Sequence, residues 1–248
     1  MKVPALTYHK VSETWELPLT MMRPRAFRRQ MEFLQKKGYR GCSLKEYLAK
    51  PSKNLFVITF DDAYENIFTF AYPILKNLGF TATVFPVTDY IGRQNTWDIS
   101  PGDIRIFHMN AQQICRLHTA GWEIASHGQS HKVMTLLSSA DIKNELTVSK
   151  SILEDLLGDT VDTFCFPFGV SDDNIVSACK KAGYSHLVGL KDENNIIGRM
   201  AVYRGVDGRH SVYRKISSKH LFNFLEKIKE DFFHSFSAVT RWKQSKFK

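Results

Sequence analysis

Short apolar runs alternate with segments of helical spacing along most of the chain. Residues 55–60 form a continuous β-rich run, which predicts a strand buried on both faces. Further strands are predicted at 81–87, 122–126, 163–166, 186–190 and, as a short last one, 202–204. Helical spacing predicts helices at 64–78, with a break at Pro73, and at 110–119, 138–157 and 172–182.

The order of these elements predicts a fold class. Repeated strand-then-helix units produce a parallel sheet with helices outside it. At 248 residues, an α/β fold of the irregular, partly closed β/α barrel type is favoured over an open doubly wound sheet. No linker, repeat or low-complexity tract interrupts the pattern, so residues 1–218 are predicted to form one barrel domain.

The last thirty residues, 219–248, have a different pattern. Apolar residues recur at helical spacing and a basic stretch follows them, which predicts an amphipathic helix with a basic tail. Packing of this helix on the barrel, with the tail in solvent, is the first interpretation. Peripheral contact of the tail with an anionic membrane is the alternative.

The charge and composition of the chain limit the classes of partner that it is expected to bind. The 34 basic and 25 acidic residues give a net charge of +9, which favours anionic partners such as phosphorylated sugars or phospholipid headgroups. No nucleic-acid recognition motif appears, so no nucleic-acid partner is predicted. The four cysteines form no CxxC pair, the start does not resemble a signal peptide, and no apolar run could span a bilayer. We therefore expect a cytoplasmic protein, with contact to the inner face of the membrane as an option.

Two adjacent carboxylates, Asp61 and Asp62, follow the strand predicted at 55–60. Barrel enzymes place their active sites at the C-terminal ends of strands. Neighbouring side chains on an extended chain point in opposite directions, so one carboxylate can bind a metal while the other faces the substrate. The alternative is a loop aspartate that caps the next helix, and this alternative is favoured when the pair is considered alone.

A second candidate, His127-Gly128-Gln129-Ser130-His131, follows the strand predicted at 122–126. On one helical turn, histidines four residues apart present both imidazoles to a single point, where a metal can bind. Two polar loop histidines are the alternative. Together with a carboxylate from another strand end, the pair supplies the ligand set of a hydrolytic zinc site.

A third segment leads from the strand at 163–166 into a turn at Pro167, Phe168 and Gly169. The backbone N–H groups of Phe168 and Gly169 are candidates for stabilising an oxyanion, although a plain turn is the simpler interpretation. His9 stands at the end of the first apolar run. A single histidine in such a place is more often structural than catalytic, so His9 considered alone is interpreted as structural. The sequence has no G-x-S-x-G elbow, P-loop or G-x-G-x-x-G, which argues against serine hydrolases, NTPases and dinucleotide enzymes.

Taken together, these segments resemble the polysaccharide deacetylase family, the NodB-homology group of carbohydrate esterases. The matching motifs are 59–62, 126–131 and 164–169, and the likeness continues in order from about Leu6 to Arg204. The resemblance implies an irregular β/α barrel that removes N-acetyl groups from sugars, usually with Zn²⁺. It also implies the site residues, which are Asp62, His127 and His131 as metal ligands, Asp61 as general base and Phe168 as an oxyanion donor.

The sequence departs from the broader family at two points. Many members carry an arginine two residues before the proline of the third motif, where this chain has Cys165. Many also supply a general acid from a C-terminal Leu-x-His, of which no clear copy is found. The chain resembles a branch with Phe-x-Tyr/Phe-Pro-x-Gly as third motif and a Tyr-His pair near its start. This resemblance implies His9 as the acid, and Arg204 is predicted to replace the missing arginine.

The predicted function is therefore a metal-dependent hydrolase that removes N-acetyl groups from an amino sugar or glycan. Its substrate is expected to be an N-acetylated sugar, with a phosphate- or lipid-linked form as an option because of the basic charge. A deformylase or another amidase on a lipid- or phosphate-linked amino sugar is one alternative. A glycan-binding barrel without catalysis is the other.

Overall fold

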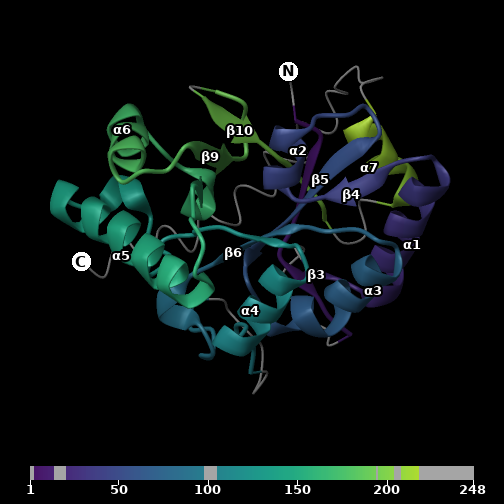
Figure 1. The fold of residues 1–248 in the computed structure, drawn as a ribbon, viewed down its shortest axis with the longest axis horizontal. Helices are drawn as coiled ribbons and strands as arrows, with labels where there is room; N and C mark the ends of the chain where they lie inside the picture. The colour runs from purple at the N-terminus through teal and green to yellow at the C-terminus, as the bar shows by residue number, and fades with distance from the viewer. Residues whose placement is uncertain (1–2, 14–20, 98–104, 194, 204–207, 218–248) are drawn as a thin grey trace.

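The computed structural model describes residues 3–13, 21–97, 105–193, 195–203 and 208–217 (Figure 1). The helix and basic tail predicted at 219–248 lie outside the described residues, as does the predicted Arg204. Within the described ranges, every helix is too short or too polar to cross a membrane.

The main sheet is parallel and has β5 at its centre. Its strands run in the order β11 (Met200–Ala201), β1 (Ala5–Tyr8), β5 (Leu55–Asp62), β6 (Thr83–Pro86) and β7 (Glu123–Ile124). A further strand, β4 (Arg40–Cys42), pairs with the first half of β5, on the edge that β6 takes along the second half.

A second parallel sheet continues the wall of the barrel in the order β10 (Ile196–Gly198), β9 (His186–Gly189) and β8 (Thr163–Cys165). A parallel bridge between Ser126 and Phe164 joins it to the segment after β7. At the other end, only Arg199 separates β10 from β11. The predicted fold class, an irregular and partly closed β/α barrel, is confirmed. A small pair, β2 (Lys10–Val11) with β3 (Met21–Met22), stands apart from it.

Helices surround the strands (Figure 1). They are α1 (Pro24–Lys36), α2 (Leu44–Ala49), α3 (Tyr72–Asn77), α4 (Ala111–Thr119), α5 (Ser139–Leu157), α6 (Asp173–Lys181) and α7 (Arg209–Ile216). Polar caps begin several of them, because side-chain oxygens accept the first free N–H groups: Asn110 begins α4, Ser138 begins α5 and Asp172 begins α6. Gly158 ends α5 in the left-handed conformation, with φ of 63°.

Two predicted elements differ in the structure. The helix predicted at 64–78 is divided into a π-helical turn, Ile67–Ala71, and α3, which has Pro73 in its first turn. Proline lacks an N–H and interrupts the regular helical ladder, which accounts for the break. The strand predicted at 202–204 is absent at residues 202 and 203, the part of it that the structure describes. The structure places β10 and β11 earlier, and strands of two or three residues carry too little periodicity to locate from sequence.

The strands pack on both faces, and their alternation decides which face each side chain takes. Val57 belongs to an inner cluster that also holds Ala5, Phe85 and Val188 from neighbouring strands. The adjacent residues Phe56, Ile58 and Phe60 pack outward against the helices. Because side chains alternate along a strand, Asp61 lies on the same face as Val57, toward the barrel interior.

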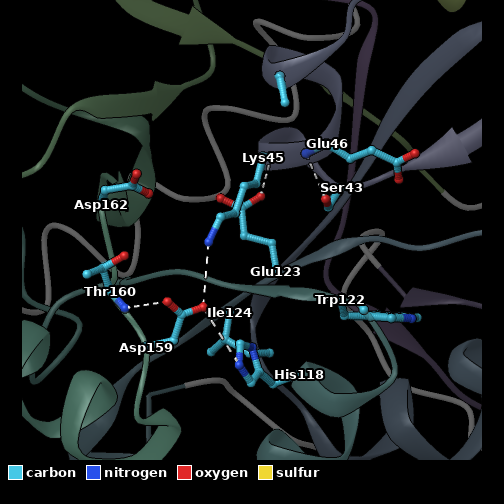
Figure 2. A pocket seen from close by; sticks show the side chains of 12 residues that line it. Ser43, Lys45, Glu46, His118, Trp122, Glu123, Ile124, Asp159, Thr160 and Asp162 are labelled. Carbon is cyan, nitrogen blue, oxygen red and sulfur yellow. Dashed lines mark hydrogen bonds and ion pairs between the residues drawn. The ribbon is translucent and has the colours of Figure 1, made fainter.

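The end of the barrel near the start of β7 and β8 carries a separate polar network around a cavity of about 430 Å³ (Figure 2). The buried carboxylate of Glu123 accepts hydrogen bonds from the Thr83 and Thr163 hydroxyls, at 2.7 and 2.9 Å, and from the Lys45 N–H at 2.8 Å. These contacts join β6, β7, β8 and α2. In β/α barrels this N-terminal end serves stability, so the catalytic residues are expected at the opposite end.

Candidate active site

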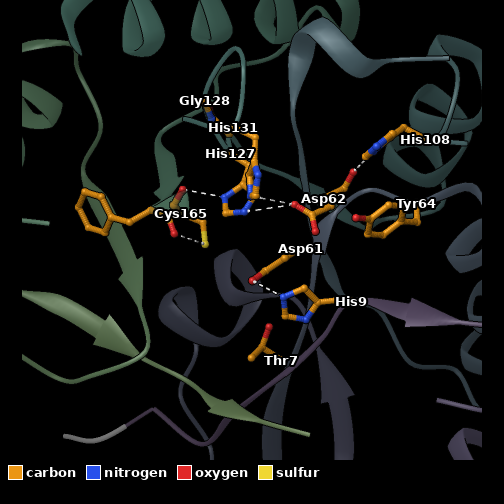
Figure 3. A network of polar contacts seen from close by, with 12 residues as sticks. Thr7, His9, Asp61, Asp62, Tyr64, His108, His127, Gly128, His131 and Cys165 are labelled. Atoms are coloured by element: carbon orange, nitrogen blue, oxygen red, sulfur yellow. Dashed lines mark hydrogen bonds and ion pairs between the residues drawn. The ribbon is translucent and has the colours of Figure 1, made fainter. Parts of the chain in front are cut away.

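Three side chains from two separate parts of the chain converge beyond the C-terminal ends of the strands (Figure 3). The Oδ1 atom of Asp62 lies 3.6 Å from Nε2 of His127 and 3.3 Å from Nε2 of His131. All three residues are buried, and one ligand atom from each lies within 4.8 Å of the others. The structure thus brings together the carboxylate and the two imidazoles that the sequence analysis assigned to a metal.

The segment that holds the two histidines is a loop. Gly128 and His131 both have positive φ, at 83° and 56°, which a continuous right-handed helix does not allow. The prediction that His127 and His131 lie on one helical turn is therefore wrong. The imidazoles meet because the left-handed residues fold the loop back on itself.

The end of β5 is also left-handed. Asp62 has φ of 65° and Ala63 has φ of 51°, a conformation that costs residues other than glycine about 1–2 kcal/mol. The surrounding chain holds this turn, because Nδ1 of His108 lies 2.6 Å from the Asp62 carbonyl and the Met109 N–H donates to the Ala63 carbonyl at 2.8 Å. The turn removes Asp62 from the alternation of the strand, so both carboxylates lie at the same end of the barrel.

The geometry around His127 determines its protonation. Its Nδ1 lies 2.8 Å from the Cys165 carbonyl, which can only accept, so the neutral ring carries its hydrogen there and leaves Nε2 with a lone pair. Burial lowers the pKa of His127 to about 4, although the charge of Asp61 acts in the opposite direction. The imidazole is therefore neutral at neutral pH, which is the state that binds a metal.

This donor set fits a divalent metal. Two imidazoles and one carboxylate are the ligand set of a hydrolytic Zn²⁺ site, which keeps open positions for water and substrate. A second group of potential ligands, Asp61, His127 and Cys165, also lies within 4.8 Å. It fits less well, because burial raises the pKa of the Cys165 thiol well above its usual range and Asp61 is bound by Arg199.

The carboxylate of Asp61 is held by a buried arginine. Arg199 donates to both of its oxygens, at 2.5 and 3.0 Å, and the same guanidinium donates to the hydroxyls of Thr7 and Thr59. Burial alone would raise the pKa of Asp61, but the charges of Arg199 and then of His9 hold that pKa well below its usual range. Asp61 is therefore ionised at neutral pH and able to accept a proton.

Arg199 was not predicted from the sequence. The arginine beside Asp61 was predicted to be Arg204, which lies outside the described residues, whereas the structure shows Arg199 bound to Asp61. Arg199 also donates to Cys165 Sγ at 3.0 Å, so it reaches the residue that stands where many family members carry arginine. An arginine directly after the apolar run Ile196–Gly198 was an available signal, because arginine is rarely buried unless it is paired.

Two further predicted residues, His9 and Phe168, lie beside the site. Nε2 of His9 lies 3.9 Å from Oδ2 of Asp61, and the His9 side chain is 31% exposed. Phe168 has φ of 59°, and its ring packs 4.6 Å from that of His131. The N–H of Gly169 donates to the Phe166 carbonyl, so only Phe168 stays a candidate oxyanion donor. Trp97, which sequence reasoning missed, stacks on His131 at 4.4 Å.

The chain is a partly closed β/α barrel. It carries an Asp-His-His centre at the C-terminal ends of its strands. Residues 49–187 match the model of the family described as polysaccharide deacetylase. The chain belongs to the polysaccharide deacetylase family.

Two relatives have the same sequence identity to this chain. YxkH of Bacillus subtilis, which carries the name of a polysaccharide deacetylase, is 27% identical over 189 residues, covering 74% of this chain. The chain spans 62% of the length of that relative. A poly-β-1,6-N-acetyl-D-glucosamine N-deacetylase of Staphylococcus aureus is 27% identical over 210 residues, covering 76% of this chain and 72% of the relative.

Solved structures support the fold. The deacetylase PplD of Streptococcus pyogenes, solved with acetate, superimposes with a TM-score of 0.75 at 19% identity, covering 87% of this chain and 98% of that one. IcaB from Ammonifex degensii gives a TM-score of 0.72 at 18% identity, covering 86% and 96%.

Replacing Arg199 with methionine is expected to lower the free energy of unfolding by about 3–5 kcal/mol, because Asp61 then stays buried without its cation. The pKa of Asp61 should also rise, since Arg199 no longer lowers it, so the acid limb of the activity profile moves to higher pH. Urea unfolding at pH 7 measures the first effect. Arg28→Met, at an exposed arginine of α1, is the matched comparison, and equal losses in both variants would contradict the role given to Arg199.

Proposed function

We propose that the chain is a metal-dependent hydrolase that removes N-acetyl groups from an amino sugar in a glycan. One observation carries the proposal: Asp62, His127 and His131 face a common point, with the ionised Asp61 beside them. Three metal ligands and a separate proton acceptor are the parts that metal-assisted amide hydrolysis requires. The names of the relatives agree with this chemistry.

Each side chain has a proposed task. Asp62, His127 and His131 would hold a divalent metal, for which we propose Zn²⁺, and this ion would lower the pKa of water to about 7 and polarise the acetyl carbonyl. Asp61 takes the proton of the attacking water, and Arg199 keeps this carboxylate ionised and oriented. The N–H of Phe168 donates to the acetyl oxygen as negative charge develops on it.

The proposed general acid is His9, whose ring lies on the exposed side of Asp61. His9→Gln is expected to slow amide hydrolysis by about 10²–10⁴-fold, since the departing amine no longer receives a proton. An acetyl ester with a good leaving group needs little protonation, so its hydrolysis should change much less. Asp61→Asn should slow both substrates. Near-wild-type amide turnover in His9→Gln would exclude His9 as the acid.

The substrate is tested by following acetate release from N-acetylglucosamine oligomers with Zn²⁺. We propose a β-1,6-linked oligomer as the first one to test, because the Staphylococcus relative is named for that polymer. Formylated and diphosphate-linked sugars form parallel arms, since the charge of +9 favours an anionic substrate. Glycan binding without acetate release, in Zn²⁺, Co²⁺ and Mn²⁺ alike, would support a binding protein instead.

The cellular location and the membrane contact stay proposals based on sequence alone. A cytoplasmic protein whose basic C-terminal residues contact the inner membrane surface should co-sediment with anionic liposomes. Co-sedimentation that is unchanged after deletion of residues 241–248 would remove the membrane proposal.

A further inference from the structure

The loop from His127 to His131 supplies two of the three proposed metal ligands, and a carboxylate from α5 binds its backbone. Oε2 of Glu145 accepts the N–H of Gln129 at 2.7 Å and the N–H of Ser130 at 2.9 Å. Its Oε1 accepts a short hydrogen bond from the Ser130 hydroxyl. Both bonded residues lie between the two histidines, so Glu145 contacts the loop at its centre.

Glu145 is buried, with 7% of its surface exposed. Burying a carboxylate is costly unless hydrogen bonds compensate, and bonds to a charged acceptor are about twice as strong as neutral ones. In the described part of the chain, the hydrogen bonds to this side chain come from the histidine loop. The cost of burying Glu145 is therefore offset only while the loop keeps its shape.

The opposite side of the loop is fixed by the chain that follows β6. The N–H of Thr88 donates to the Gly128 carbonyl at 3.2 Å, and the N–H of Asp89 donates to the Gln129 carbonyl at 2.9 Å. Backbone carbonyls are thus bound from one side and backbone N–H groups from the other. Gly128 also lies against Glu145, because a Cβ added at this glycine would be 3.2 Å from Oε2.

One turn further along α5, Ser149 extends the same support. Its Oγ accepts the Ser126 hydroxyl at 2.9 Å, and Oγ of Ser126 accepts the N–H of Gly128 at 3.1 Å. Helix α5 therefore binds the loop at successive positions. Since α5 has 19 residues and a cap at each end, it provides a rigid support for the loop.

We propose that Glu145 is a positioning residue of the metal centre. Its carboxylate holds Gln129 and Ser130 so that the imidazoles on either side, His127 and His131, direct Nε2 toward Asp62. This inference rests on the proposed function, because it takes the Asp-His-His group as the metal site. The hydrogen bonds of the Glu145 carboxylate within the described residues go to Gln129 and Ser130, and none of them reaches a proposed ligand atom.

The test compares the Zn²⁺ affinity of Glu145 variants, measured by competition with a chromophoric chelator. Glu145→Ala removes the acceptor, and Glu145→Asp keeps the charge but withdraws it by one methylene. Both are expected to bind Zn²⁺ about 10–100-fold more weakly, the range observed when partners of metal ligands are removed. Glu145→Gln keeps an acceptor oxygen in place and should retain most of the affinity.

Glu154→Ala is the matched control on the same helix. Glu154 also accepts a backbone N–H from a loop, that of Val161 at 3.0 Å, but this loop carries no proposed ligand. Its loss should lower stability without changing Zn²⁺ affinity. The Co²⁺ absorption spectrum gives a second readout, because a displaced imidazole changes the coordination geometry, and circular dichroism verifies that each variant is folded.

The outcomes separate the two proposals. Failure of the unaltered chain to bind Zn²⁺ would overturn the proposed function. Wild-type affinity in a folded Glu145→Asp variant would overturn only the role of Glu145, and this variant decides the question if Glu145→Ala does not fold. A loss in Glu145→Gln as large as in Glu145→Ala would also overturn the positioning role, because the amide oxygen of glutamine can still accept from the loop.

Discussion

Asp61→Asn is expected to reduce acetate release by about 10²–10⁴-fold while the chain keeps its affinity for Zn²⁺. Asparagine has nearly the same shape and can still accept hydrogen bonds from Arg199, but it cannot take a proton from water at neutral pH. The proposed ligands Asp62, His127 and His131 are unaltered. The measurement is therefore a pair: acetate release from N-acetylglucosamine oligomers, and Zn²⁺ binding by chelator competition.

The neighbouring residue provides the control for this prediction. Asp62→Asn makes the same chemical change one residue further along, but it removes a charged metal ligand, so both Zn²⁺ affinity and acetate release should fall. The two variants separate proton transfer from metal binding at adjacent positions of β5. If Asp61→Asn kept more than about a tenth of wild-type turnover, Asp61 would not be the general base.

His131→Ala is expected to weaken Zn²⁺ binding by more than the 10–100-fold that follows loss of an outer partner, because it removes a ligand atom itself. Acetate release should fall with metal occupancy and recover in part at high Zn²⁺ concentration. Direct titration of metal-free protein measures the change.

His118→Ala serves as the comparison, since His118 lies on α4 and pairs with Asp159 at the other end of the barrel, 3.8 Å away. This variant should bind Zn²⁺ like the unaltered chain. Equal affinities in His131→Ala and His118→Ala would remove His131 from the metal site.

The elements that sequence predicted well are those with strong local signals. The continuous apolar run of β5 and the capped α4 and α5 carry their periodicity and their end signals within one stretch of chain. The two short strands, β10 and β11, lack such a signal, because their position depends on pairing with β9 and β1. The pairing of β11 with β1 joins residues from opposite ends of the described chain, so no local pattern locates it.

The residues of the site also fall into two groups, those that the sequence predicted and those that it did not. Asp61, Asp62, His127 and His131 were predicted because three motifs in order, each at a predicted strand end, resemble the polysaccharide deacetylase family, and parallel strands end on one side of a barrel. The supporting residues were missed, since a partner for a buried carboxylate can come from anywhere in the chain. Arg199 is 138 residues from Asp61, and nothing local to either residue shows that they meet.

Glu145 illustrates the same limit on a helix. A glutamate inside a capped, 19-residue helix indicates only that the segment favours a helix. The hydrogen-bond partners of Glu145 lie 15 and 16 residues earlier in the chain. The helical turn predicted for His127 and His131 failed for a related reason. The spacing of the histidines is compatible with a helix, but the left-handed Gly128 and the contacts from α5 select a loop.

The central claim is that Asp62, His127 and His131 hold one catalytic ion, and a single titration tests it. Zn²⁺ is added stepwise to metal-free protein while acetate release from an N-acetylglucosamine oligomer is followed. The structure predicts that activity rises in proportion to bound metal and reaches its plateau at one ion per chain. Full activity in the metal-free protein, or a plateau that is unchanged when His127 and His131 are both replaced by alanine, would contradict it.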